Sequence, residues 1–487
     1  MTKNARIWVA AFGAALVAAS TSAWAQQADA LLKRVSQAMG AEPVNSIKYT
    51  AEGVGFTFGQ AYVPGMPWPM ITVHSQVRTI NYETGSMREE ITLSRAEPKG
   101  GGGYPLSGQQ KNEGYVSGNF AWNVAGGNPV AGPRFVVDRN HQLWITPHGV
   151  VRAALKNGAK VDFVKRDGKQ FAAISFSQPG IFSAIAYVNA DNLIERVESR
   201  VPEPVYGEVT VVTTYTDYRD FGGLKYPAII QQWVGPHPTL DVVVKEAQAN
   251  APADITAPDA VKSATERVTS EKVADGVWFI GGGSHNSVVI EMKDHIVLVE
   301  APLYDGRTLP VLEEAKKLVP GKPIRYVINS HQHHDHSGGL RAAAADGAII
   351  VTQAANRPYL EKAFATPVSI RPDKYAAAKA TAKFLEVKDR HTMTDGTRTL
   401  EIERITDSVH NDTFLMVYLP KEKLLIEADA YTPLAVGAQP PATPSANHVN
   451  LIENIEKKKL AIDKILPLHG RVVPVADLYT AASRTPK

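Results

Sequence analysis

The amino-acid sequence predicts an α+β protein with a large, mostly antiparallel β domain followed by a domain of mixed α/β layering. The chain has 487 residues, more than one ordinary hydrophobic core holds together. Apolar residues recur with a period of two over most of residues 26–250, whereas strand and helix patterns alternate over residues 271–487. Residues 251–270 between them contain prolines, several alanines and few large apolar side chains, which is typical of a linker.

The first 25 residues have the composition of a secretory signal peptide. Lys3 and Arg6 precede an alanine-rich apolar run at residues 7–19, and residues 23–25 (Ala-Trp-Ala) offer a cleavage site with small residues. The alternative is an uncleaved membrane anchor, but the run is shorter than the roughly 20 residues that span a bilayer. We therefore expect an exported protein, periplasmic in a bacterium, with no stable membrane insertion.

Composition narrows the classes of function. The chain contains no cysteine, which excludes disulfide bonds, a thiolate nucleophile and cysteine-ligated metals. Loss of Lys3 and Arg6 with the signal peptide lowers the formal net charge from +3 to about +1. Without a long basic run, charge gives no reason to expect nucleic acid or an anionic membrane as a partner. A small-molecule substrate is the expected partner, and homo-oligomerisation stays open.

The N-terminal half is expected to contain many strands and few helices. Apolar residues at helical spacing predict a helix from Asp29 to Met39. Thr146 and Pro147 predict the start of a second helix, which runs to Lys156. Period-two segments predict strands at residues 76–82, 171–177, 209–215, 229–234 and 240–245.

The C-terminal half is expected to alternate strands with helices. Helices are predicted at residues 309–319, from about residue 338, near residue 357 and around residues 451–455. Strands are predicted at residues 277–280, 287–292, 296–300, 324–328, 349–352, 399–405, 414–419, 424–427 and 465–468.

The decisive segment for function is residues 330–339, Ser-His-Gln-His-His-Asp-His-Ser-Gly-Gly, directly after an apolar strand. Imidazole and carboxylate groups are good ligands of divalent zinc, and His331 with His333 can chelate one ion from the same side. Asp335 and His336 are placed to reach a second ion. The alternative is an adventitious cluster of histidines, which leaves unexplained why further candidate ligands follow later in the chain.

This segment matches the H-x-H-x-D-H motif of the metallo-β-lactamase superfamily, and residues 272–487 resemble that superfamily. The resemblance implies an αββα sandwich with metals held by loops at one edge of the two sheets. It implies two groups of ligands with one shared carboxylate: His331, His333 and His410 for the first metal, Asp335, His336 and His469 for the second, and Asp429 as the bridge.

One position departs from the superfamily pattern. Glu300 stands at a strand end where the superfamily commonly has an aspartate that supports a ligand histidine from behind. Glutamate would do this with a longer reach, and the alternative is a solvent-exposed carboxylate. His285, in a glycine-rich turn, and Tyr431, just after Asp429, are candidates for substrate contact, with packing as the alternative for Tyr431. His334, between the ligands, is expected to point away from the metals.

The implied ligand set predicts hydrolysis. Two zinc ions hold a bridging water and lower its pKa towards about 7, so that the resulting hydroxide attacks an ester, lactone or amide carbonyl. Asp335 would orient this hydroxide and is the expected catalytic residue. Histidine and carboxylate also bind manganese and iron, so these metals are not excluded.

The resemblance also narrows the branch of the superfamily. The lack of cysteine excludes the β-lactamase classes with a cysteine ligand, and Asp429 favours the glyoxalase II and lactonase-like branches. Two other classes stay open. One is a periplasmic protein whose N-terminal sheet binds an apolar ligand and whose metal site is structural or vestigial. The other is a mononuclear iron oxygenase of the same fold.

Overall fold

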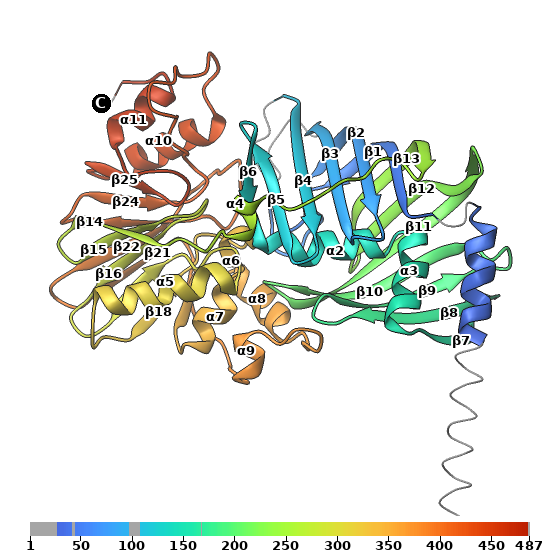
Figure 1. The fold of residues 1–487 in the computed structure, drawn as a ribbon. Helices are drawn as coiled ribbons and strands as arrows, with labels where there is room; N and C mark the ends of the chain where they lie inside the picture. The colour runs from blue at the N-terminus through green and yellow to red at the C-terminus, as the bar shows by residue number, and fades with distance from the viewer. Residues whose placement is uncertain (1–26, 41–43, 97–107, 167, 486–487) are drawn as a thin grey trace, which may run out of the picture.

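The computed structural model describes residues 27–40, 44–96, 108–166 and 168–485, arranged as two β-rich bodies (Figure 1). The predicted signal peptide, residues 1–25, lies outside the described residues. In the described part of the chain, no helix combines the length and the apolar composition that a membrane span requires.

The N-terminal body is built on a single antiparallel sheet of 13 strands in the order β6-β5-β4-β3-β2-β1-β13-β12-β11-β10-β9-β8-β7. The first and last strands of this body pair with each other, as Ile47 opposite Ala249 shows, so the chain enters and leaves near one point. The strands are β1 (Ser46–Phe56), β2 (Met70–Asn81), β3 (Ser86–Arg95), β4 (Gln110–Ser117), β5 (Phe120–Ala125), β6 (Asn128–Ala131), β7 (Lys160–Arg166), β8 (Lys169–Gln178), β9 (Phe182–Val188), β10 (Ile194–Glu203), β11 (Gly207–Phe221), β12 (Leu224–Val234) and β13 (His237–Ala249).

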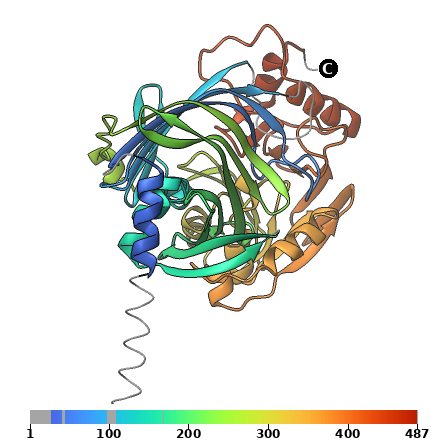
Figure 2. The same cartoon turned by 90° about the vertical axis from the view of Figure 1, so that its right-hand side faces the viewer.

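This sheet curves around its helices, as Figure 2 shows. A helix at residues 27–38, the 3-10 turn η1 (Pro133–Phe135), α2 (Val136–Trp144) and α3 (Pro147–Asn157) accompany it. Residues from these helices and from one face of the strands form one continuous core. The apolar side chains whose alternation in the sequence predicted the strands therefore lie on the inward face of one curved sheet.

The helices of this half agree only partly with the sequence prediction. Thr146 caps α3 as expected, since its side chain accepts a hydrogen bond from the backbone of Gly149. The helix at residues 27–38 begins before Asp29, the expected first residue. Helix α2 was not predicted, because its sequence, VVDRNHQLW, is poor in strong helix formers. Tertiary packing of Leu143 and Trp144 in the core stabilises it instead.

The segment expected to be a linker packs against the N-terminal sheet. Ile255, Ala257 and Val261 form a small buried cluster with Trp122 of β5. Val261 belongs to the single-turn helix α4 (Asp259–Lys262). The apolar residues of this stretch are few, as the sequence suggests, but they are enough to hold it in place.

The C-terminal body contains two sheets. The first, of seven strands, has the order β14-β15-β16-β17-β18-β19-β20, and the second, of six, runs in chain order from β21 to β26. The strands are β14 (Thr269–Ala274), β15 (Val277–Gly281), β16 (Ser287–Glu291), β17 (Ile296–Val299), β18 (Ile324–Ile328), β19 (Ile349–Gln353), β20 (Lys383–Val387), β21 (Arg390–Thr394), β22 (Thr399–Arg404), β23 (Leu415–Leu419), β24 (Leu424–Glu427), β25 (Lys464–Pro467) and β26 (Val473–Pro474).

Helices cover both outer faces of these sheets, which gives the predicted αββα sandwich (Figure 1). One buried cluster joins the first sheet to the helices on its outer face, and another joins the two sheets to each other and to α10 and α11. The helices are α5 (Asp305–Leu318), α6 (His334–Ser337), α7 (Leu340–Ala345), α8 (Asn356–Phe364), α9 (Lys374–Ala377), α10 (Ala446–Lys458) and α11 (Val475–Ala481). The predicted α+β fold is thus confirmed for the whole molecule.

Candidate metal centre

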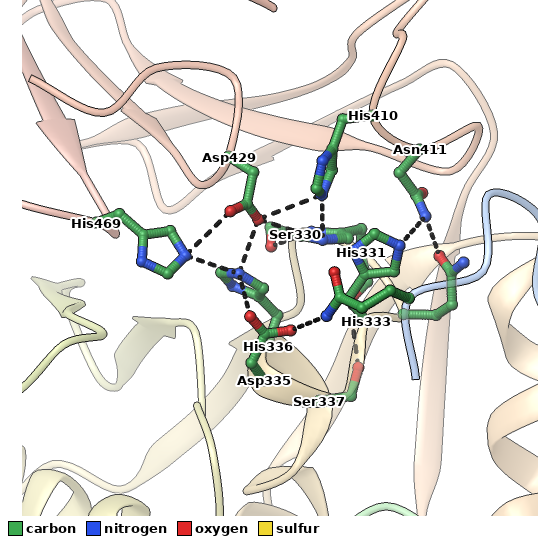
Figure 3. A network of polar contacts seen from close by, with 12 residues as sticks. Ser330, His331, His333, Asp335, His336, Ser337, His410, Asn411, Asp429 and His469 are labelled. Carbon is green, nitrogen blue, oxygen red and sulfur yellow. Dashed lines mark hydrogen bonds and ion pairs between the residues drawn. The ribbon is translucent and has the colours of Figure 1, made fainter. Parts of the chain in front are cut away.

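The seven predicted metal ligands meet at one edge of the C-terminal sandwich (Figure 3). The histidine-rich segment follows β18, which ends at Ile328. Asp429 lies two residues after β24 and His469 two residues after β25, while His410 lies between β22 and β23. Loops at the ends of neighbouring strands bring residues far apart in the sequence into one small volume. Asp335 and His336 belong to the short helix α6, so both project from one helical turn.

The first group of candidate ligands contains three buried histidines, His331, His333 and His410. Their ligand atoms all lie within 4.8 Å of one another. Nε2 of His331 is 3.2 Å from Nε2 of His410, and the rings of His333 and His410 have centroids 4.6 Å apart. Three imidazoles that face one point provide the donors of a three-histidine metal site.

The second group contains Asp335, His336, His469 and, in addition to the predicted residues, His285. Nε2 of His336 lies 3.1 Å from Nε2 of His469, and Nε2 of His285 lies 3.2 Å from Oδ2 of Asp335. His285 was predicted as a substrate contact only. A single histidine in a glycine-rich turn carries no spacing signal, so the sequence could not place it among the ligands.

Asp429 lies between the two groups. Its Oδ2 is 2.8 Å from Nε2 of His336, 3.4 Å from Nε2 of His331 and 3.5 Å from Nε2 of His410. Its Oδ1 is 3.1 Å from Nε2 of His469. One carboxylate therefore contacts histidines of both groups, which is the geometry required of a bridging ligand.

The protonation states of the cluster follow from burial and mutual charge. Burial lowers the pKa of His331 well below its ordinary value, and it lowers that of His333 to about 3. Burial would raise the pKa of Asp429, but the surrounding histidines, His336 first among them, hold it well below its ordinary value. The same balance keeps Asp335 ionised. Neutral imidazoles and ionised carboxylates are the forms in which these groups bind metal ions.

Glu300 supports one histidine of each group. Nδ1 of His336 donates to Glu300 Oε2 at 3.0 Å. Nδ1 of His331 donates to Oγ of Ser330 at 3.0 Å, and that hydroxyl in turn donates to Oε2 of Glu300. Glu300 is fully buried and adopts a left-handed backbone conformation with φ of +72°. These bonds leave Nε2 of both histidines free to bind a metal ion. Orienting ligand histidines in this way is the expected function of a supporting carboxylate.

The N-terminal body also contributes to the centre, through the loop at residues 57–69 between β1 and β2, which we call the β1–β2 loop. Nε2 of His333 donates to the carbonyl oxygen of Ala61 at 3.0 Å. His333 Nδ1 is buried without a hydrogen-bond partner. The Ala61 carbonyl thus selects the tautomer of His333 in which Nδ1 carries the free lone pair.

Other residues of the β1–β2 loop reinforce this contact. Nε2 of Gln60 donates to Oδ1 of Asp335 at 2.8 Å, and the hydroxyl of Tyr62 donates to the carbonyl oxygen of Ser408 at 2.7 Å. Gly59 approaches His334 so closely that an added Cβ would lie 2.4 Å from the ring. None of these loop residues was predicted, because no local pattern reveals contacts between residues about 275 positions apart in the chain.

Arg307 fixes the turn that carries His285. This fully buried side chain donates to the carbonyl oxygens of Gly281, at 3.0 Å, and of His285, at 3.1 Å. It also donates to the carbonyl oxygen of Arg267, at 2.7 Å, and forms an ion pair with Glu266. One side chain of α5 thereby holds both the turn and the end of the linker.

The donor set fits divalent metal ions. Imidazole nitrogens 3.1–3.2 Å apart, as in the pairs His336–His469 and His331–His410, need a shared proton or a cation between them. The unpartnered Nδ1 of His333 is a buried lone pair that is costly unless something binds it. Burial would lower the pKa of His336, but Asp429 and Asp335 hold it well above its ordinary value, so the carboxylates require a positive charge here.

The two remaining predicted residues lie apart from the ligands. Tyr431 is 1% exposed and packs against His448 with ring centroids 5.1 Å apart, contacts that agree with the packing alternative. His334 points away from the ligand cluster, as expected. Its Nδ1 is 2.9 Å from a carboxylate oxygen of Glu203, and its Nε2 lies 2.9 Å from the hydroxyl of Tyr359.

Comparison with known proteins gives one family match and several similar solved structures. Residues 280–469 match the family model described as "Metallo-beta-lactamase superfamily". No curated protein matches the chain. One similar solved structure is a metallo-beta-lactamase from Pontibacter korlensis, with 17% identity, coverage of 45% of this chain and 98% of that chain, and a TM-score of 0.34. Another is the metallo-beta-lactamase FIM-1 from Pseudomonas aeruginosa in its mono-zinc form, with 20% identity, coverage of 45% of this chain and 95% of that chain, and a TM-score of 0.34. A third is a metallo-beta-lactamase from Hirschia baltica, with 20% identity, coverage of 45% of this chain and 99% of that chain, and a TM-score of 0.34.

The αββα sandwich, the order of the candidate ligands and the family match define the class of the C-terminal domain. It belongs to the metallo-beta-lactamase superfamily. Members of this superfamily are generally metal-dependent hydrolases, and the described residues contain candidate metal sites built from histidine and aspartate.

Proposed function

We propose that this protein is an exported hydrolase that holds two zinc ions and cleaves an ester, lactone or amide bond in a small molecule. The observation that carries the proposal is the pair of adjoining ligand groups that share Asp429. A vestigial site would have no reason to retain all seven donors. A mononuclear oxygenase would leave the second group, with Asp335 and His469, without a role.

The bound metals would supply a water nucleophile of lowered pKa and would polarise the scissile carbonyl. The chain's own residues position the reaction. Asp335 is the most exposed of the candidate ligands, with 26% of its side chain accessible, and it is oriented by Gln60 and His285. It is therefore the carboxylate best placed to accept a proton from water or to orient it. Glu300 and Ala61 keep three ligand histidines in the tautomers that metal binding needs.

A hydrolysis panel tests the proposal. The protein from residue 26 onwards would be assayed with lactones, aryl esters, a chromogenic cephalosporin, a phosphodiester and an aryl sulfate, each with and without a chelator. We expect chelator-sensitive turnover of an ester, lactone or amide, reduced by several orders of magnitude in His331→Ala. Circular dichroism of the variant would show that the fold is retained.

Two results would contradict the proposal. Activity in His331→Ala equal to that of the parent would mean that the cluster does not carry the chemistry. A protein that binds about one iron per chain and consumes oxygen would instead be the mononuclear oxygenase.

A further inference from the structure

A cleft lies between the N-terminal body and the loops beside the candidate metal centre. A cavity of about 640 Å³ is lined on one side by η1 and its neighbours and on the other by the turn at residues 282–284 and by Tyr304. A second cavity, of about 650 Å³, lies within the curved N-terminal sheet. The two cavities share Asn123, Arg134 and Phe135 in their walls, so they meet at η1.

Two residues of the cleft wall, Ser284 and Leu303, contact the second ligand group. Oγ of Ser284, in the cleft wall, is 2.9 Å from Nδ1 of His285, and the carbonyl oxygen of Ser284 is 3.3 Å from Nδ1 of His469. Leu303, also in the wall, donates its backbone N–H to the carbonyl oxygen of Asp335 at 2.8 Å. The cleft that reaches η1 thus lies beside the second ligand group, with only its wall residues between them.

Arg134 is the cation at the junction of the two cavities. It is exposed to the cleft, and within the described part of the chain no carboxylate forms an ion pair with it. Its guanidinium lies 4.5 Å from the centroid of the Phe135 ring. The cleft walls partly remove solvent from this guanidinium and lower the pKa of Arg134, whereas the negative charge of Asp335 acts to raise it.

The neighbouring Arg139 provides a contrast. It lies over the same Phe135 ring at 4.4 Å, but it donates to the carbonyl oxygens of Tyr115 and Trp122 at 2.9 and 2.8 Å. Gly132 permits the ring to sit there, because a Cβ would come within 2.6 Å of it. Phe135 and Arg139 thus form a fixed support, while the donors of Arg134 remain free for a ligand.

We propose that Arg134 binds an anionic group of the substrate, a carboxylate or a tetrahedral oxyanion, at a distance from the bond cleaved at the metal centre. The substrate class is therefore an anionic ester, lactone or amide whose charged end is recognised by the N-terminal body. A guanidinium recognises both kinds of anion through its fork of N–H donors. The statement that the other end of the substrate is cleaved at the metal centre rests on the proposed function.

The test compares two matched esters, neutral para-nitrophenyl hexanoate and the mono-para-nitrophenyl ester of adipic acid, which carries a remote carboxylate. In Arg134→Gln, kcat/KM for the anionic ester should fall about tenfold more than that for the neutral ester, and Arg134→Lys should recover part of the difference. Arg219→Gln removes an exposed arginine of β11 and should change neither value. Equal losses on both esters in Arg134→Gln would overturn the proposal.

Direct binding separates this site from the hydrolytic function. Adipate and, in a second arm, inorganic sulfate would be titrated calorimetrically into the parent protein and Arg134→Gln. About tenfold weaker adipate binding in the variant supports a carboxylate site, and the same loss for sulfate alone supports a tetrahedral anion. If the parent hydrolyses no ester but shows this loss, the proposed function fails and the anion site stands. Unchanged binding of both anions overturns the site.

Discussion

At the scale of single residues, Glu300 supports histidines of both ligand groups. Its carboxylate orients His336 directly and His331 through Ser330, so one buried side chain serves both ligand groups. An aspartate here, as the superfamily commonly has, would be one methylene shorter. The positive φ of Glu300 is a strained conformation for a residue with a side chain, and such strain is often found at functional sites.

We therefore predict that Glu300→Gln lowers the affinity of the protein for metal about 10- to 100-fold, the usual effect of removing a supporting carboxylate. The amide cannot accept two hydrogen bonds with the strength of a charged carboxylate. Metal retained after dialysis against a weak chelator measures the effect. Exposed Glu313 on α5 provides the control, and a Glu300→Gln protein that retains as much metal as Glu313→Gln would contradict the prediction.

At the scale of elements, the β1–β2 loop makes the N-terminal body part of the metal centre. Gln60 and Ala61 contact Asp335 and His333, and the backbone of Gly59 lies against His334. Close approach at Gly59 requires the absence of a side chain. The loop should therefore be sensitive to small changes that leave the sheet on either side intact.

Gly59→Ala should lower both metal affinity and activity, because a Cβ 2.4 Å from the ring of His334 forces the β1–β2 loop away from Asp335 and His333. Gly180→Ala is the matched control. Its φ of +72° resembles the +78° of Gly59, but nothing lies within 4 Å of the added Cβ. Both variants share the backbone strain, so equal metal affinities would show that the loop contact does not matter.

Gln60→Ala tests the same loop through a side chain. A hydrogen bond to a charged group such as Asp335 contributes about 1.5–3 kcal/mol of free energy, which the variant loses. We expect about tenfold lower kcat with a smaller change in the melting temperature. Gln170, exposed on β8, is the control residue. A loss of melting temperature without any loss of kcat would assign Gln60 a structural role only.

At the scale of the whole molecule, the sequence predicted the αββα sandwich and the ligand order but not how the two halves meet. The segment from His331 to His336 is contiguous, and its later partners follow strands with clear apolar patterns. His285, Gln60 and Ala61 reach the centre through tertiary contacts, for which single-sequence patterns carry no signal. Helix α2 escaped prediction for a related reason, because packing overrides its weak propensity.

The N-terminal core makes stability depend on pH. Burial lowers the pKa of His141 to about 3 and that of His148 to about 4, from an ordinary value of 6.5. Both are neutral in the fold, whereas the unfolded chain protonates them below pH 6.5. Stability contributed by the neutral forms is present above pH 6.5 and is lost as the pH falls towards 4, by up to about 1.4 kcal/mol per pH unit for each histidine.

Urea unfolding at pH 7, 6 and 5 measures this dependence. His141→Gln should reduce the slope of the unfolding free energy against pH by up to about 1.4 kcal/mol per pH unit, the contribution of one histidine. This holds even if the variant is less stable at every pH. His74→Gln, which changes an exposed residue, should leave the slope as it is. An unaltered slope in His141→Gln would contradict the burial argument.

We propose that the two ligand groups form one dinuclear centre joined by Asp429. The most direct measurement is the metal content of the purified protein by inductively coupled plasma mass spectrometry, beside that of Asp429→Ala. We predict about two metal ions per chain in the parent, mainly zinc, and a clear loss in the variant. A parent protein with no bound metal, or one whose content is unchanged by loss of Asp429, would contradict the account.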